Sequence, residues 1–227
     1  MRKPRKVTEK VYQIGGPDIS HSQDCMIFIV DVGSKESVLI DCGAGNSFNT
    51  LLQNIKAVDL EPSKIKTLLL THCHIDHIGA AKKFKEQFNC QIIAHEKDRE
   101  AIEGRDTTKT AAQWYGLYYT PVKIDNTILG DFQKLSIGDV EFNCIHTPGH
   151  TPGSISVYCD IEGTRVLFGQ DIHGPFDESF GSNIEDWKES MKKLLGLEAD
   201  ILCEGHFGIY KPKEEVKRYI EGYLRRY

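Results

Sequence analysis

Three histidines and an aspartate crowd into one short stretch of the chain, THCHIDHIG at residues 71–79. His72 and His74 are two residues apart, so at the end of a strand both side chains point the same way and converge on one ion. Asp76 and His77 follow in the next turn and can reach a second ion nearby. Nitrogen ligands with one harder carboxylate suit zinc, and also iron, manganese or cobalt. The stretch therefore predicts a metal centre.

Further residues of ligand type follow three later runs of apolar residues. The segment HTPGHTPGS at 146–154 places two histidines, His146 and His150, on a Pro-Gly turn. Asp171 comes just after TRVLFG, and His206 comes just after DILCEG. Polar ligand types at successive strand ends, all opening into glycine-rich loops, imply that these residues share one rim.

Hydrophobic periodicity predicts the elements that must position these residues. Apolar residues at helical spacing predict four helices. The first begins at Ser47, the second carries Ala80 to Phe88, the third spans 185–195, and the last opens at Pro212. Runs of β-branched and aromatic residues predict strands near 11–15, 26–32, 37–41, 66–72, 91–95, 140–146, 154–160, 164–169 and 200–205.

Each half of the chain runs strands first and then alternates strand and helix. This order predicts an α+β fold of four layers (αββα), in which two mostly antiparallel or mixed sheets pack face to face with helices outside. The 227 residues are enough for one sizeable core, and no linker rich in Gly, Pro or Ser divides them. We therefore expect a single domain over residues 1–227.

Composition narrows the class of partner. With 40% hydrophobic residues, 27% charged residues and a net charge of −5, the chain is typical of globular proteins and gives no sign of nucleic-acid binding. It has no apolar run of about 18 residues and no signal-type leader. Its seven scattered cysteines form no CxxC pair, which favours free thiols. We expect a cytoplasmic protein with a small-molecule substrate and no membrane partner, and a homodimer is left open.

The order HxHxDH, then His, then Asp, then His resembles the metallo-beta-lactamase superfamily over nearly the whole chain. In that family the histidine of the TPGHT turn is the ligand, which corresponds to His150 rather than His146. The LIDCG element is similar to the family's LIDTG, which implies that Asp41 supports the site from behind. The resemblance implies one ion held by His72, His74 and His150 and a second held by Asp76, His77 and His206, with Asp171 between them.

The resemblance also implies a mechanism. Two divalent ions, zinc in the first place with iron or manganese as alternatives, would share a hydroxide that attacks an acyl carbon. Asp76 would be the catalytic residue that orients this hydroxide and passes a proton to the leaving group. The expected enzyme is therefore a dinuclear metal-dependent hydrolase.

The sequence is compatible with several substrate classes. The TPGHTPGS turn most resembles the hydroxyacylglutathione hydrolase (glyoxalase II) branch, which cleaves thioesters. Glyoxalase II carries a further helical region that helps hold glutathione, whereas this chain ends about one helix after His206, so an ester or lactone is a rival. A mononuclear-iron persulfide dioxygenase is the alternative class. Flavodiiron proteins, nucleic-acid-processing members and a non-catalytic metal-binding module fit less well, because they would need a flavin domain, an extra basic domain or a lost ligand.

An aromatic segment at residues 114–119 is our hypothesis for the wall of the substrate pocket, with Trp114 and Tyr118 as the contacting rings and an apolar acyl or aryl group as their ligand. Packing of these rings on the core is the alternative. His173, and with it His21, lies in a loop that could face the pocket. The other two histidines, His95 and His146, are expected to be structural.

Overall fold

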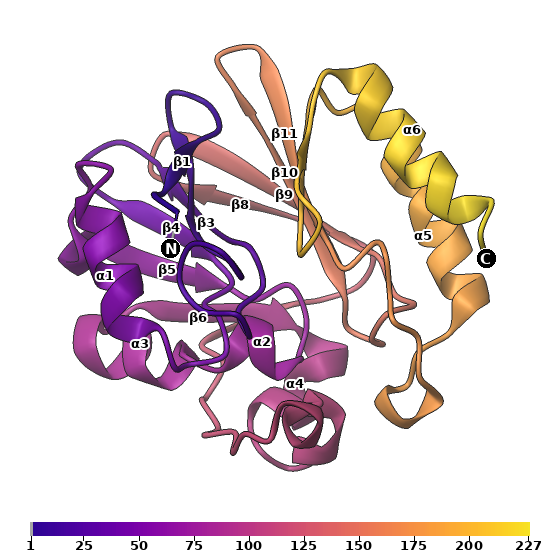
Figure 1. Cartoon of the computed structure of the whole chain (residues 1–227), viewed down its shortest axis with the longest axis horizontal. Coiled ribbons are helices and arrows are strands. Elements are labelled where there is room, and N and C mark those ends of the chain that lie inside the picture. Colours follow the sequence, from indigo (N-terminus) through magenta and orange to yellow (C-terminus); the bar gives the residue numbers. More distant parts are fainter. Residues whose placement is uncertain (1) are drawn as a thin grey trace.

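The computed structural model describes residues 2–227, and it consists of two β-sheets packed face to face with helices on both outer sides (Figure 1). Alternation along the strands produces these layers. In β3 (Ile27–Asp31), Phe28 and Val30 belong to the core between the sheets, whereas Ile27 and Ile29 belong to the core under the helices. The predicted four-layer αββα fold is confirmed.

The first sheet contains seven strands in the order of the sequence. Its strands pair antiparallel from β1 to β4 and parallel from β4 to β7. Besides β3, its strands are β1 (Arg5–Lys6), β2 (Val11–Gly15), β4 (Ser37–Ile40), β5 (Ile65–Leu69), β6 (Gln91–His95) and β7 (Asn126–Ile128).

The second sheet has the order β13-β12-β11-β10-β9-β8. All its pairs are antiparallel except β11 with β12, which run parallel. Its strands are β8 (Phe132–Ile137), β9 (Val140–His146), β10 (Ile155–Ile161), β11 (Thr164–Gln170), β12 (Ile201–Glu204) and β13 (Ile209–Tyr210).

The helices divide between the two outer faces (Figure 1). On the first sheet, the apolar faces of α1 (Phe48–Lys56), α2 (Ile75–Ile78), α3 (Ala81–Phe88) and α4 (Arg99–Ile102) enclose one core. On the second sheet, α5 (Ile184–Gly196) and α6 (Lys213–Leu224) enclose another, which contains Trp187 and Ile220. Residues 2–227 also contain five 3₁₀ turns: η1 (Pro62–Lys64), η2 (Glu96–Asp98), η3 (Thr107–Thr110), η4 (Ala112–Tyr115) and η5 (Glu178–Phe180).

Some elements differ from the sequence prediction. The strands β1, β7, β8 and β13 were not predicted, because three of them have only two or three residues and β8 carries mostly exposed or half-exposed side chains. Pro212 precedes α6 as its N-cap rather than opening the helix from within. No helix among residues 2–227 is both long enough and apolar enough to cross a membrane.

The central strands β4, β5, β9, β11 and β12 all end toward the same edge of the molecule. Two pairs, β4 with β5 and β11 with β12, are parallel neighbours. Two successive antiparallel pairings bring β9 back into the direction of β11. The loops after these strands therefore meet, as expected for residues that share one rim.

Candidate metal centre

Chain direction at the end of β5 explains how the first four candidate ligands are placed. His72 lies in the loop after β5, and His74 is the last residue before α2. The first turn of α2 then carries Asp76 and His77, which are both buried. A short extended segment followed at once by a helical turn therefore aims four side chains into one space.

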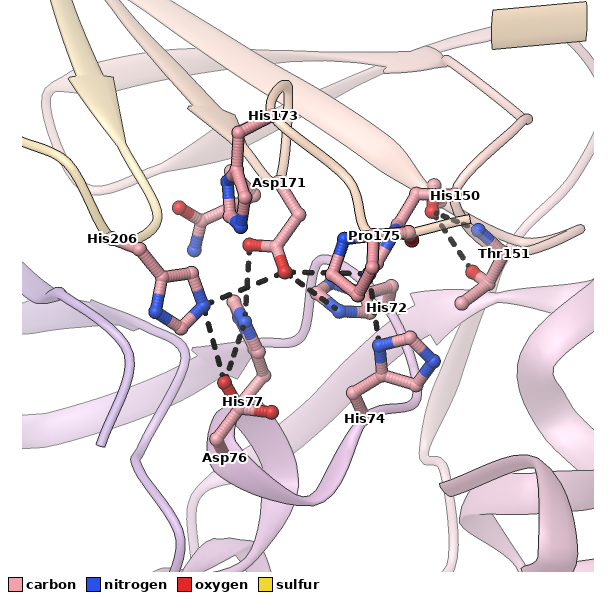
Figure 2. A network of polar contacts seen from close by, with 12 residues as sticks. His72, His74, Asp76, His77, His150, Thr151, Asp171, His173, Pro175 and His206 are labelled. Atoms are coloured by element: carbon pink, nitrogen blue, oxygen red, sulfur yellow. Dashed lines mark hydrogen bonds and ion pairs between the residues drawn. The ribbon is translucent and has the colours of Figure 1, made fainter. Parts of the chain in front are cut away.

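The structure brings the seven predicted ligands together in two donor groups (Figure 2). Within each group the potential ligand atoms all lie within 4.8 Å of one another. The first group is His72, His74, His150 and Asp171, and the second is Asp76, His77 and His206. Asp171 lies between them, because its Oδ2 is 3.3 Å from His150 Nε2 and its Oδ1 is 3.2 Å from His77 Nε2.

The spacing of the donor atoms fits metal ions. Four ligands at about 2.0–2.1 Å around a tetrahedral ion lie about 3.3 Å from each other. The Oδ2 atom of Asp76 is 3.5 Å from His77 Nε2 and 3.2 Å from His206 Nε2. Among the described residues, the buried Nε2 atoms of His72 and His77 have no hydrogen-bond partner, and neither has Asp171 Oδ1, whereas His74 approaches His150 Nε2 through its Nδ1 at 2.8 Å. Buried polar atoms rarely lack partners, so a cation would satisfy them.

Three of the imidazoles are held through the ring nitrogen that faces away from the centre. His77 donates from Nδ1 to Asp41 Oδ2 at 2.7 Å, and His150 donates from Nδ1 to the carbonyl of Pro175 at 2.8 Å. His72 Nδ1 lies 3.2 Å from Thr71 Oγ1, which in turn donates to Asp41. In the neutral ring these contacts leave Nε2 unprotonated and directed at the centre, which is the tautomer that a metal ligand needs.

The electrostatics of the cluster divide its histidines into two sets, one with lowered and one with raised pKa values. Burial and the neighbouring His150 lower the pKa of His74 to about 3. Burial, together with His77, places the pKa of His72 well below its usual range. Although burial works against its charge, the imidazoles of His77 and His206 hold the pKa of Asp171 well below its ordinary value. In turn, and again against burial, Asp171 and Asp76 raise the pKa of His206 to about 10 and help to raise that of His77 well above its usual range, so both imidazoles must release a proton when a divalent cation binds.

Asp41 stands directly behind the centre, where the sequence analysis placed it. It directly follows β4 and has a positive φ of 58°, a conformation that aspartate tolerates better than most residues. Its carboxylate also accepts the backbone N–H of Thr71 at 2.8 Å and a side-chain hydrogen bond from Gln170 at the end of β11. Asp41 therefore fixes His77 and joins the two sheets at the same point.

Asp98, in η2, was missed by the sequence analysis. Its buried carboxylate accepts hydrogen bonds from the Cys73 backbone at 3.0 Å, from Thr151 Oγ1 at 2.7 Å and from the Gly153 backbone at 2.7 Å. It thereby ties the loop of His72 and His74 to the turn of His150. An aspartate near the end of a predicted strand is the only signal in the sequence, and it does not reveal such distant partners.

A cavity of about 300 Å³ opens beside the donor groups. Of the three residues predicted to contact the substrate, Trp114 and His173 line this cavity, but Tyr118 does not, since its side chain is fully exposed. The 3₁₀ turn η4 turns Tyr115 inward instead, and Tyr115 was not singled out from the sequence as a contacting ring. The full lining is Pro17, His74, Asp76, Ala111, Trp114, Tyr115, His150, Asp171, His173, Pro175, Phe180, His206 and Phe207.

The remaining histidines lie apart from the donor groups. His95 and His146 are both buried, and their rings stack with centroids 4.1 Å apart. His146 Nε2 also contacts the carbonyl of Pro152 at 2.8 Å, so the structural role predicted for both residues agrees with their packing. His21 is not among the residues that line the cavity.

Comparisons with known proteins agree with this geometry. The model of the metallo-beta-lactamase superfamily matches residues 23–206. The hydroxyacylglutathione hydrolase GloC of Haemophilus influenzae is 33% identical over 89% of this chain and 93% of its own length. The probable metallo-hydrolase YflN of Bacillus subtilis is 28% identical over 74% of each chain.

A solved structure shows the same fold. A mutant metallo-beta-lactamase from Cronobacter sakazakii superposes with a TM-score of 0.84 at 21% identity, over 100% of this chain and 95% of that one. At this identity the likeness concerns the fold alone. The family match over residues 23–206 and the similarity to GloC show that the chain belongs to the metallo-beta-lactamase superfamily and is a metal-dependent hydrolase, and the shared fold agrees with this.

Proposed function

We propose that the protein is a dinuclear metal-dependent hydrolase that cleaves an uncharged ester, lactone or thioester. One observation carries the proposal: two complete donor groups lie side by side with the carboxylate of Asp171 between them. His72, His74 and His150 would hold one ion, and Asp76, His77 and His206 the other. Zinc is the ion we expect first, with iron or manganese as alternatives.

Two divalent ions at these donors would supply a water that ionises near neutral pH and would polarise an acyl oxygen. The surrounding side chains would orient the attacking water and carry the proton. Asp76 lines the cavity, and its Oδ2 lies 3.2 Å from His206 Nε2 and 3.5 Å from His77 Nε2. With one oxygen toward the donors, its second oxygen is available to orient the attacking water and to carry a proton to the leaving group.

The lining of the cavity supports an apolar substrate. Trp114, Tyr115, Phe180 and Phe207 contribute four aromatic rings, and Trp114 packs edge-on against Phe180 with centroids 4.7 Å apart. Among the lining residues there is no lysine or arginine to pair with a carboxylate. Glutathione carries two carboxylates, so this lining favours a neutral acyl or aryl group over a glutathione thioester.

The alternative class, a mononuclear-iron persulfide dioxygenase, is not favoured. A single ion would use only one donor group, and the buried His77 Nε2 of the second group would then keep no partner. A dinuclear hydrolase uses both groups.

The proposal is tested by turnover of zinc-loaded and chelator-stripped protein on a matched panel: an aryl ester, an acyl lactone, a simple acyl thioester and the glutathione thioester of the same acyl group. We expect hydrolysis of the neutral substrates that disappears on stripping and returns with zinc. Activity that survives stripping would contradict the metal-dependent mechanism. A clear preference for the glutathione thioester would contradict the substrate class.

A further inference from the structure

Glu204 is a fully buried carboxylate that no step above uses. It ends β12 directly beside Gln170 of β11. Its Oε1 lies 2.8 Å from His173 Nδ1, and its Oε2 accepts the backbone N–H groups of His206 and Phe207, each at 2.7 Å. One buried anion therefore fixes the His173 ring and the loop that carries His206.

This contact sets the tautomer of His173. Because Nδ1 donates to the carboxylate, the neutral ring presents an unprotonated Nε2. The same arrangement holds His77, whose Nδ1 donates to the equally buried Asp41 at 2.7 Å. Histidines that bind metals commonly donate their other nitrogen to a carboxylate in this way. His173 thus has the support of a ligand without having been assigned as one.

The position of His173 matches this support. It lines the cavity, and its ring packs against His206 with centroids 5.1 Å apart. Figure 2 shows the ring reaching from its own loop toward Asp171, on the same side as His206. Asp171, His173 and His206 have potential ligand atoms that all lie within 4.8 Å of one another.

We propose that His173 is a further nitrogen ligand of the ion held by Asp76, His77 and His206, and that Glu204 is its positioning residue. The inference rests on the proposed metal centre, but it does not depend on the substrate. Counting Asp171, this ion would then have five candidate protein donors, and His173 shares a donor group with two of them, Asp171 and His206. Zinc prefers four ligands, so at this second position alone the extra donor favours ions that accept six, such as manganese, iron(II) or cobalt(II).

The test is a titration of metal-free protein with cobalt(II), followed by visible absorption and by calorimetry. In wild type we expect two ions per chain, the second with the weak absorption typical of a six-coordinate ion. In His173→Ala the second ion should bind about 10–100-fold more weakly, and its absorption should strengthen as the coordination number falls. Binding of the first ion should be unchanged. His21→Ala is the matched control and should behave as wild type.

Glu204→Gln tests the positioning step without removing the imidazole. The backbone N–H groups of His206 and Phe207 need an oxygen acceptor, so the amide NH₂ of glutamine must face His173. That contact moves the ring proton to Nε2 and blocks it as a ligand. We expect the same loss of second-ion affinity as in His173→Ala.

Equal second-ion affinity and spectrum in wild type and His173→Ala would overturn the inference, as would a wild type that binds only one cobalt ion. The expected changes in binding would uphold it even if the protein hydrolysed nothing. Because the readout is binding and not turnover, failure of this inference and failure of the proposed hydrolysis are distinguished.

Discussion

At the scale of single residues, Asp171 connects the two donor groups. Its two oxygens lie 3.2–3.8 Å from the Nε2 atoms of His72, His77, His150 and His206. No other carboxylate in either group reaches imidazoles of both. Burying this carboxylate together with four imidazoles costs free energy unless a cation bound between them pairs with their polar atoms.

Replacement of Asp171 by alanine should therefore remove one ion and most turnover. We expect metal content to fall from about two ions per chain to one or fewer, and kcat/KM to fall by more than about a hundredfold. Plasma mass spectrometry of protein purified without chelator measures the first, and ester hydrolysis measures the second. Full occupancy with full activity would show that Asp171 is not a ligand.

Asp41→Asn should weaken metal binding while preserving the backbone. Asparagine tolerates the positive φ of this position, but its neutral amide pairs less strongly with His77 Nδ1. The affinity of the ion next to His77 should fall about 10–100-fold. A competition assay with a coloured chelator reports this affinity. If the variant competes as well as wild type, the contact is structural only.

At the scale of elements, the centre depends on loops that come from both sheets. Asp98 joins the loop after β5 to the turn between β9 and β10, through Cys73, Thr151 and Gly153. These loops carry the three histidines of the first donor group. Their relative position is thus set by a residue that holds no ion itself.

Asp98→Ala leaves three buried donors without their acceptor. We expect the free energy of unfolding to fall by about 3 kcal/mol, measured on metal-free protein by urea titration. Glu96→Ala, an exposed acidic residue of the same 3₁₀ turn, is the control and should change it by less than about 0.5 kcal/mol. Equal effects of the two substitutions would contradict this account of the loops.

Trp114 and Tyr118 lie in one short segment but have different environments. Trp114 lines the cavity against Phe180, whereas Tyr118 points into solvent. Trp114→Ala should raise KM for aryl and long-chain esters about tenfold, with little change for acetyl esters, because apolar contact is lost only for the larger groups. Tyr118→Ala should leave the panel unchanged. Steady-state kinetics of both variants measures these changes in KM. Equal changes in the two variants would show that Trp114 does not contact the substrate.

The features that could be predicted from the sequence are those that depend on the spacing of residues close together along the chain. The ligands in residues 71–77 and the long strands depend on spacing along the chain, which the sequence displays directly. Asp98, Glu204 and Tyr115 act through partners that are distant in sequence or through the turn of a short 3₁₀ segment. The prediction for Tyr118 was wrong for the same reason, since neighbouring rings do not share one face there.

At the scale of the whole molecule, the centre lies where the two halves meet. The first sheet supplies His72, His74, Asp76 and His77, and the second supplies His150, Asp171 and His206. The halves share a hydrophobic core and hydrogen bonds such as that between Gln170 and Asp41, and in addition each ligand set at the centre draws on both halves. Bound ions would therefore link the halves and stabilise the fold through binding.

Removal of metal should lower the unfolding temperature. At a free-ion concentration about a hundred times the dissociation constant, each ion adds about 2.7 kcal/mol. For a chain of this length that corresponds to about 5–10 °C per site. Calorimetric scans before and after chelation, and again after zinc is restored, measure the change. An unfolding temperature that is indifferent to metal would mean that the ions do not link the two halves.

The number of metal ions per chain, measured together with the reaction, decides whether the centre is a dinuclear hydrolase. Protein purified without chelator is examined by native and plasma mass spectrometry, while ester and lactone hydrolysis and oxygen uptake on a persulfide are followed on the same sample. For a dinuclear hydrolase we expect about two ions per chain, hydrolysis, and no oxygen uptake. A single iron with oxygen uptake on the persulfide would contradict it.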